Sequence, residues 1–205
     1  MKKVLLAVLA VTALATASFA GDFGLGLKIG GGQNDPKDLK EAFDYFGGEL
    51  TKSPAMASLE GLYEWNIGGE ELDEIGSANK MGLRFGLDVY GQNKYERFAT
   101  KVTENTAAIP VSLYYKRDGG IKSASFYIGG GVTALYTFMD ITTADDLDNT
   151  KIFPHVMAGV EYRFSKLFAL GLDFKYNINA KNEKDGVIIS DRSGLQGALA
   201  ARFYF

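Results

Sequence analysis

The sequence predicts an all-β protein: an eight-stranded antiparallel up-and-down β-barrel that crosses a membrane, with a short helix in its first outer loop. From residue 22 to the last residue, apolar side chains alternate with polar or small ones in repeated stretches of roughly ten residues. Successive side chains of a strand point to opposite faces, so each stretch has one apolar and one polar face. The large side chains share the apolar face, whereas glycines and charges share the other. This pattern is typical of a barrel whose outer surface faces lipid.

The clearest stretch covers residues 167–178. Its large apolar side chains are Phe168, Leu170, Leu172, Phe174, Tyr176 and Ile178. The residues between them are Ala169, Gly171, Asp173, Lys175 and Asn177. The same alternation predicts strands over residues 23–30, 59–67, 81–90, 109–116, 126–136, 155–164, 167–178 and 195–205. About ten tilted residues cover the apolar band of an outer membrane, roughly 25 Å tall. Closure of the barrel avoids unpaired backbone groups in lipid.

Two features of the strands predict local backbone structure. Pro110 has no backbone N–H to donate to a neighbouring strand, so it predicts a strand end or a bulge. The glycine runs at residues 30–32 and 129–131 lack the strand–turn–helix surroundings of a dinucleotide site. They favour strand curvature instead.

The connections alternate in length. Long polar segments follow the first, third, fifth and seventh strands, and short ones, residues 117–122 and 165–166, follow the fourth and sixth. Long outer loops and short periplasmic turns are the usual arrangement of bacterial barrels. Residues 68–80, which contain four acidic side chains, are long for a periplasmic turn. The sequence leaves open whether this segment caps the barrel mouth or extends a hairpin.

The first outer loop carries the signals of a short amphipathic helix. Asp35 is placed as the N-cap, Pro36 as the first helical residue and Gly47 as the terminator. The apolar stripe between them is Leu39, Phe43 and Phe46. The helix either covers the barrel mouth or contacts the membrane surface or a partner.

Residues 1–20 predict a secretory signal peptide that is cleaved. Lys2 and Lys3 form a basic start, residues 4–14 an apolar run, and Ser18-Phe19-Ala20 a small-x-small end. The run is shorter than the about 20 residues that a transmembrane helix needs, although an uncleaved helical anchor is the alternative. The barrel domain is therefore expected over residues 21–205.

Composition narrows the function classes. The chain has no cysteine, so disulfides and thiolate sites are excluded. The net charge of −3 is spread along the chain, and no basic patch indicates a nucleic-acid partner. Glycine is frequent at 25 residues, and aromatic side chains make up 13 % of the chain. Both suit amphipathic strands in a membrane.

The aromatic side chains at outward positions predict two belts at the membrane surfaces. The belt near the periplasmic ends consists of Trp65, Tyr115, Phe126, Tyr162, Phe164, Phe168, Phe203 and Phe205. A sparser outer belt consists of Tyr136, Phe138 and Tyr176. A soluble, lipocalin-like barrel is the alternative fold, but it would not expose aromatic rings in two belts.

The chain resembles the small outer-membrane β-barrel family that includes the OmpA transmembrane domain, OmpX and the opacity-type, porin-like proteins. The resemblance rests on the signal peptide, eight amphipathic strands and the aromatic end Arg202-Phe203-Tyr204-Phe205, and it covers residues 21–205. It implies a location in the cell outer membrane of a Gram-negative-type envelope, with outer-membrane lipid around the barrel. It also implies that Phe203 and Phe205, with Ala201 and Leu199, form the signal that the barrel-assembly machinery recognises.

The inward face predicts a charge network in the barrel interior. The inward cations are Lys28, Arg84, Lys116, Arg163, Lys175 and Arg202. The inward anions are Glu60, Glu64, Asp88, Glu161 and Asp173. Six cations against five anions favour ion pairing, and an eight-stranded barrel is just wide enough for side chains to fill it. A narrow water-filled or ligand-admitting pathway is the alternative.

The sequence predicts no catalytic, cofactor or metal site. His155, the only histidine, faces inward, and a hydrolytic barrel would need it beside a serine or carboxylate that substrate can reach. The position two residues later, where small deacylase barrels place a serine, is Met157. The acidic stretch Asp140, Asp145, Asp146 and Asp148 lacks the spacing of a calcium loop.

These observations favour a non-enzymatic outer-membrane protein with a structural or surface-interaction role through its outer loops. A narrow channel for small solutes is the main alternative. A lipid-modifying enzyme that depends on His155 is the remote one.

Overall fold

A computed structural model describes residues 21–32, 41, 44–45, 47–51, 53–67, 79–118, 123–142, 147–184 and 187–205. The predicted signal peptide, most of the long acidic connection, and Asp145 and Asp146 lie outside the described residues. Among the described residues, no helix has the length and hydropathy required to cross a bilayer.

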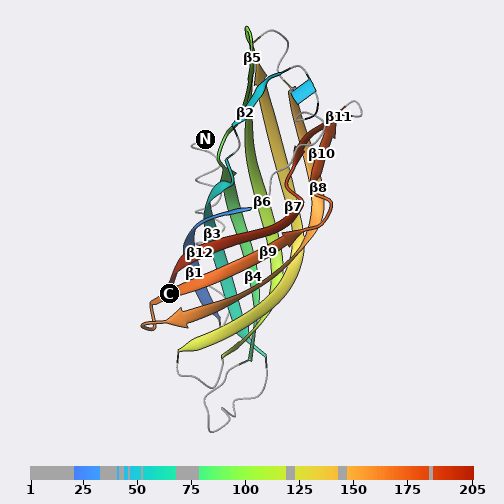
Figure 1. Ribbon diagram of the computed structural model, residues 1–205. Coiled ribbons are helices and arrows are strands. Elements are labelled where there is room, and N and C mark those ends of the chain that lie inside the picture. Colours follow the sequence, from blue (N-terminus) through green and yellow to red (C-terminus); the bar gives the residue numbers. More distant parts are fainter. Residues whose placement is uncertain are drawn as a thin grey trace, which may run out of the picture.

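Strands make up nearly all of the described structure (Figure 1). The eight strands of the barrel are β1 (Asp22–Gly32), β3 (Ala55–Asn66), β4 (Asn79–Tyr90), β6 (Thr100–Asp118), β7 (Ala124–Ile141), β8 (Leu147–Arg163), β9 (Phe168–Asn177) and β12 (Gly194–Tyr204). Four shorter strands lie outside the barrel wall: β2 (Glu49–Thr51), β5 (Asn93–Arg97), β10 (Lys181–Lys184) and β11 (Val187–Asp191).

The barrel is closed. Each of its eight strands pairs antiparallel with the preceding and following barrel strand, and β1 pairs with both β3 and β12. Leu27, for example, lies between Leu59 of β3 and Ala201 of β12. The backbone groups of the wall therefore bond to one another, as lipid requires. The predicted eight-stranded up-and-down barrel is confirmed.

The predicted faces of the strands are also confirmed. Leu27 is 61 % exposed and Ile128 66 % exposed, and both lie on the outer surface. The polar side chains of Glu60 and Asp88 point inward and are buried. The membrane, which surrounds the barrel, takes the place of a protein core for the outer side chains.

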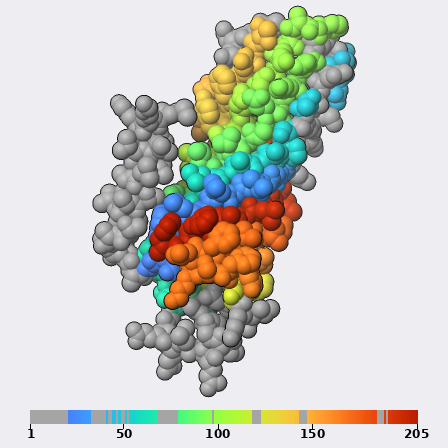
Figure 2. All heavy atoms as spheres, turned by 90° about the vertical axis from the view of Figure 1, so that its left-hand side faces the viewer, coloured from blue at the N-terminus to red at the C-terminus, as the bar shows by residue number. Residues whose placement is uncertain are grey.

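Three strands are far longer than the sequence predicts. β6, β7 and β8 contain 19, 18 and 17 residues. Beyond the barrel wall, residues 100–106 of β6 leave β4, residues 100–104 pair with β5, and β5 in turn pairs with β2. We call β2, β5, and residues 100–106, 133–141 and 147–154 of the three long strands the outer extension. Figure 2 shows these green and yellow-orange segments standing beyond the blue and red strands β1 and β12.

The sequence did not predict the outer extension, because the apolar alternation ends before the strands do. On β6, the outward side chains Thr103 and Asn105 are polar, whereas the inward side chain of Val102 is buried. Outward apolar side chains are needed only where a strand contacts lipid. The alternation therefore marks the membrane-facing part of a strand and not its full length.

Pro110 lies in the middle of β6, so the predicted strand end or bulge is wrong. Its pairing with β7 is continuous, with Pro110 opposite Thr133. On the β4 side, the ladder lacks Gly86 and Leu87 and resumes in the same register. A missing N–H removes a ladder hydrogen bond on one side only, and the strand continues because the other side is intact.

The glycines of β7 permit a close approach between strands. A Cβ atom at Gly129 would collide with the carbonyl oxygen of Leu113, and one at Gly131 with that of Val111. Both carbonyls belong to β6. Strand curvature, the role predicted for this glycine run, stays a prediction.

The predicted helix of the first outer loop falls mostly outside the described residues. Glu41, Asp44 and Tyr45 have helical backbone geometry. Gly47 has a φ of 73° and donates its N–H to the carbonyl of Asp44 at 3.0 Å, as a helix-ending glycine does. The helix itself stays a prediction.

Candidate functional site

The lumen contains the eleven charged residues that the strand alternation placed on the inner face. Eight of them are buried: Glu60, Glu64, Arg84, Asp88, Lys116, Glu161, Asp173 and Arg202. Lys28, Arg163 and Lys175 keep a small exposed fraction. They come from seven strands, and Tyr127 of β7 adds the eighth. The contacts of this lumen network run across the barrel and not merely along its wall.

Arg202 of β12 is at the centre of the lumen network. Its Nε donates to Glu60 Oε1 at 2.7 Å, its Nη2 to Asp173 Oδ2 at 2.6 Å and its Nη1 to Glu161 Oε2 at 3.2 Å. These carboxylates belong to β3, β9 and β8. One planar guanidinium, with five N–H donors in a fixed fork, thus joins three strands.

Arg84 of β4 reaches two of these carboxylates, those of Glu60 and Asp173, from the other side of the lumen. Its Nη1 donates to Asp173 Oδ2 at 2.9 Å, and its guanidinium lies 4.7 Å from the ring centre of Tyr127 and 5.0 Å from that of Tyr114. Tyr127 also donates its hydroxyl to Asp173. Lys28 Nζ lies 3.1 Å from Glu60 Oε2. The middle of the lumen is therefore filled by interlocked cations, carboxylates and tyrosines.

A second group closes the periplasmic end. Lys116 Nζ donates to Glu161 Oε1 at 2.6 Å and to Glu64 Oε1 at 3.1 Å. Tyr204 donates to Glu161 Oε2 at 2.8 Å, and the guanidinium of Arg163 lies 4.0 Å from the ring centre of Tyr204. The lysine and both glutamates are buried. This layer leaves the end of the lumen blocked by side chains.

A cavity lies on the outer side of the central group. It has a volume of about 30 Å³ and is bordered by Lys28, Arg84, Ser112, Lys175 and Gln196, among others. This is room for about two water molecules. Farther out, Lys175 donates to Asp88 Oδ2 at 2.7 Å, and a further contact, from Tyr90 to Gln196, spans 3.3 Å.

The base of the outer extension has its own buried polar group, which the sequence did not predict. Glu104 of β6 accepts hydrogen bonds from Asn93 at 2.7 Å, Thr106 at 2.9 Å and Ser190 at 2.8 Å. Arg192 Nη2 lies 3.7 Å from Glu104 Oε1. Burial lowers the pKa of Arg192 from its ordinary value. These contacts attach β5, β6 and β11 to one another.

His155 does lie beside a serine. Its Nε2 is 2.8 Å from Ser112 Oγ, and its Nδ1 is 2.9 Å from Thr133 Oγ1. All three side chains are buried. Both ring nitrogens thus have hydroxyl partners, and the partner of the second nitrogen is a threonine and not a carboxylate. Among the described residues, no group of three or more histidine, aspartate and glutamate side chains is placed to hold a metal ion.

Sequence reasoning missed the uncharged and rim members of the lumen. Tyr114, Tyr127 and Tyr204 occupy inward positions of the alternation. The alternation therefore placed these tyrosines in the lumen, although the predicted network contained charged residues only. Lys80 donates to Asp22 Oδ2 at 2.8 Å at the periplasmic rim. Arg192 lies between strands, where alternation gives no information.

Aromatic rings form a belt on the outer surface near the periplasmic ends. Ring centres are 4.8 Å apart between Tyr162 and Phe164, 6.0 Å between Phe164 and Phe168, and 5.2 Å between Phe168 and Phe203. This chain of contacts follows β8, β9 and β12. Large rings settle at the headgroup level of a bilayer, and the depth of this belt in the membrane stays a prediction.

A family model described as outer membrane protein beta-barrel domain matches residues 4–203 of the chain. A search of curated protein sequences found no match.

Several solved structures are similar. Ail, the attachment invasion locus protein of Yersinia pestis, has a TM-score of 0.52 and 11 % identity, covering 91 % of this chain and 100 % of that chain. Ail in complex with the heparin analogue sucrose octasulfate has a TM-score of 0.52 and 9 % identity, covering 91 % and 99 %. A major outer membrane protein from Thermus thermophilus has a TM-score of 0.51 and 12 % identity, covering 91 % and 100 %. Identities this low show a shared fold and nothing finer.

Proposed function

The chain belongs to the outer membrane protein beta-barrel domain family, and from this premise we propose that it is a sealed, non-enzymatic barrel that acts at the cell surface through its outer extension. The barrel is located in the outer membrane, where its lipid-facing strands anchor it. The lumen network keeps the barrel rigid and closed, and the outer extension meets the partner.

The observation that carries this proposal is the set of contacts that Arg202 makes across the lumen. Glu60, Asp173 and Glu161 surround one guanidinium, and the side chains of Arg202, Glu60 and Glu161 are almost completely buried. Breaking a buried, hydrogen-bonded ion pair costs about 3–5 kcal/mol per partner removed. A solute would have to break several such contacts in order to pass.

The outer extension supports the surface role. It is held in place by the buried contacts of Glu104 and by a small apolar cluster of Tyr95, Val102 and Met139. A structure of Ail contains a heparin analogue, which is a precedent for ligand binding by a barrel of this fold. Rigid strands that stand beyond the membrane can present residues to an external partner.

Export and assembly complete the proposal. Residues 1–20 would direct export and be removed, and Phe203 and Phe205 would present the assembly signal to the barrel-assembly machinery. Phe205 is exposed, and its backbone N–H donates to the carbonyl of Phe23 at 2.8 Å, which ties the end of the chain to β1. Phe205→Ala should slow the appearance of the heat-modifiable form in outer membranes, whereas Leu195→Ala, at an exposed position of β12 outside this signal, should not.

Planar-bilayer recording tests the sealed lumen. The unaltered protein should give no steady single-channel current. Steady currents that change when Lys28 or Glu64 is replaced by glutamine would contradict a sealed lumen and establish a pore. Heat modifiability on a detergent gel checks that each sample contains closed barrels.

A narrow channel for small solutes is a second candidate, and the cavity beside Lys28 and Ser112 is the observation that favours it. The cavity already holds space for water on the outer side of the network. A solute pathway would also have to open through the central group, where Arg84 and Arg202 both hold Asp173.

An enzyme acting on lipid is the remote candidate, and the Ser112–His155 contact of 2.8 Å is the observation that favours it. Ser112 also borders the cavity. Labelling of Ser112 by a fluorophosphonate probe, and its loss in His155→Ala, would support this candidate. If Ser112 is not labelled in closed barrels, the contact between Ser112 and His155 is a structural hydrogen bond only.

A further inference from the structure

Three cationic side chains, Lys28, Arg84 and Lys175, border the cavity on the outer side of the central group. An ammonium group has three N–H donors and a guanidinium has five. Lys28 Nζ lies 3.1 Å from Glu60 Oε2, and Arg84 Nη1 lies 2.9 Å from Asp173 Oδ2. The buried Nε of Arg84 has no hydrogen-bond partner in the described part of the chain. Several N–H donors of these cations therefore remain for a molecule in the cavity.

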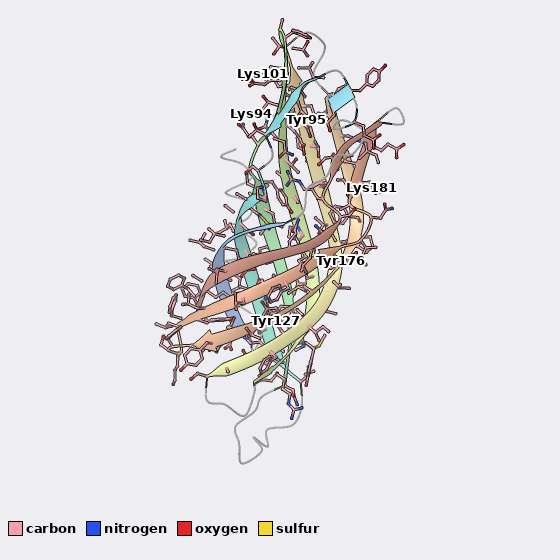
Figure 3. All side chains as sticks on the ribbon, in the orientation of Figure 1. Lys94, Tyr95, Lys101, Tyr127, Tyr176 and Lys181 are labelled. Carbon is pink, nitrogen blue, oxygen red and sulfur yellow. The ribbon has the colours of Figure 1, made fainter. Side chains whose placement is uncertain are left out.

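The two carboxylates at the border of the cavity, those of Glu60 and Asp173, are held mainly by another cation. Arg202 Nε donates to Glu60 Oε1 at 2.7 Å, and Arg202 Nη2 lies 2.7 Å from Asp173 Oδ1 and 2.6 Å from Asp173 Oδ2. Tyr127 also donates its hydroxyl to Asp173. Figure 3 shows Tyr127 in the barrel, far from Lys101 at the outer end. Three of the four carboxylate oxygens at the border therefore already accept hydrogen bonds from Arg202.

Charges of opposite sign balance in the lumen above and below this level, among the described residues. At the periplasmic end, the cations Lys80, Lys116 and Arg163 contact the anions Asp22, Glu64 and Glu161. At the base of the outer extension, Arg192 contacts Glu104. Farther out, the half-buried side chains of Lys151 and Asp191 add one charge of each sign.

The level of the cavity has an excess of one positive charge. Its cations are Lys28, Arg84, Lys175 and Arg202, and its carboxylates are Glu60, Asp88 and Asp173. Arg202 also contacts Glu161, which belongs to the periplasmic group and is held there by Lys116 at 2.6 Å. A buried charge without a partner is strongly destabilising, so this level needs one further negative charge.

We infer that the cavity binds one monovalent inorganic anion of the size of chloride, between Arg84 Nε and the ammonium groups of Lys28 and Lys175. A halide only accepts hydrogen bonds, so it matches the remaining donors and supplies the missing charge. Ser112 and Gln196, which also border the cavity, offer neutral donors. The volume of about 30 Å³ has room for such an ion but not for an organic anion. This site is independent of the proposed surface role.

The dependence of stability on chloride tests the inference. Closed barrels in a nonionic detergent are unfolded in urea at fixed ionic strength, while sodium chloride replaces sodium gluconate, whose anion is too large for the cavity. A ligand that binds only the folded state lowers the apparent unfolding constant in proportion to its concentration, above its dissociation constant. Each tenfold rise in chloride should then lower this constant about tenfold. A constant that does not change with chloride would overturn the inference.

Two lysine variants separate a bound anion from a general effect of salt. Lys28→Met leaves three cations and three carboxylates around the cavity, and Arg84 and Arg202 still contact Glu60 and Asp173. This variant should lose the dependence on chloride. Lys80→Met removes a cation from the periplasmic rim and should keep it. An equal dependence in both variants would mean that chloride acts elsewhere.

Bromide supplies a measurement that needs no variant, should Lys28→Met fail to fold. Crystals of the unaltered barrel grown in sodium bromide should show an anomalous peak between Lys28, Arg84 and Lys175. A cavity without this peak would overturn the inference. Neither result bears on conduction, because an anion on the outer side of the central group does not open a path through it.

Discussion

The guanidinium of Arg202 and the carboxylate of Glu60 meet above Gly26. Gly26 of β1 pairs with Arg202 on one side and with Glu60 on the other, and the two side chains join across it at 2.7 Å. A Cβ atom at residue 26 would lie 2.6 Å from Glu60 Oε1 and 2.7 Å from Glu60 Cγ. The glycine thus provides the space in which a β12–β3 ion pair can form over the strand between them.

Gly26→Ala should therefore destabilise the barrel by about 1–3 kcal/mol, the usual cost of overpacking. Glu60 cannot move away easily, because Lys28 and Arg202 hold its carboxylate. Urea unfolding in detergent micelles measures the change. Gly197→Ala is the matched control, since its Cβ would have no neighbour nearer than 3.8 Å. Equal losses for the two variants would contradict this account.

Arg202→Met should reduce the free energy of unfolding by about 3–5 kcal/mol, because it leaves three buried carboxylates without their shared donor. Lys80→Met, which breaks the partly exposed pair with Asp22, should cost about 1 kcal/mol or less. The same unfolding measurement compares them. A small loss for Arg202→Met would show that Arg84 and Lys28 suffice to neutralise the lumen.

Trp65 should report the depth of the periplasmic rim. It is the only tryptophan in the chain, and its ring stacks on that of Tyr63 with centres 5.6 Å apart. Trp65 lies on the outward face of β3, in the predicted headgroup-level belt. Bromine atoms on lipid chains near the headgroups should quench its fluorescence more than bromines near the chain ends. The reverse order would place the predicted belt at the wrong depth.

Glu96 should titrate below the ordinary range of a glutamate. The side-chain hydrogen bond from Lys101 lowers the pKa of Glu96, which lies outside the membrane-spanning part of the chain. Because the folded-state pKa is depressed, the pairing is present above the ordinary pKa and is lost as the pH falls through the depressed value. Carboxyl NMR titration should show the midpoint rising in Lys101→Gln. An unchanged midpoint would mean that the pair does not persist in solution.

The charged interior separates what the sequence predicts from what requires the structure. Alternation alone places Glu60, Arg84 and Arg202 on the inner face, because a strand has only two faces. Their partners lie on strands that are distant in the sequence, and the register of eight strands decides which side chains meet. His155 is similar: its inward position followed from alternation, whereas its contact with Ser112 required the structure.

By itself, the sequence determined the closed barrel, its eight membrane-facing strands and the face of each residue, because lipid imposes a period-two apolar pattern on any strand that it touches. Only the tertiary structure decided where β6, β7 and β8 end, since beyond the membrane no lipid imposes that pattern. It also decided that Pro110 interrupts one ladder without ending its strand. Finally, it placed Arg202 above Gly26, because that position depends on pairing between strands.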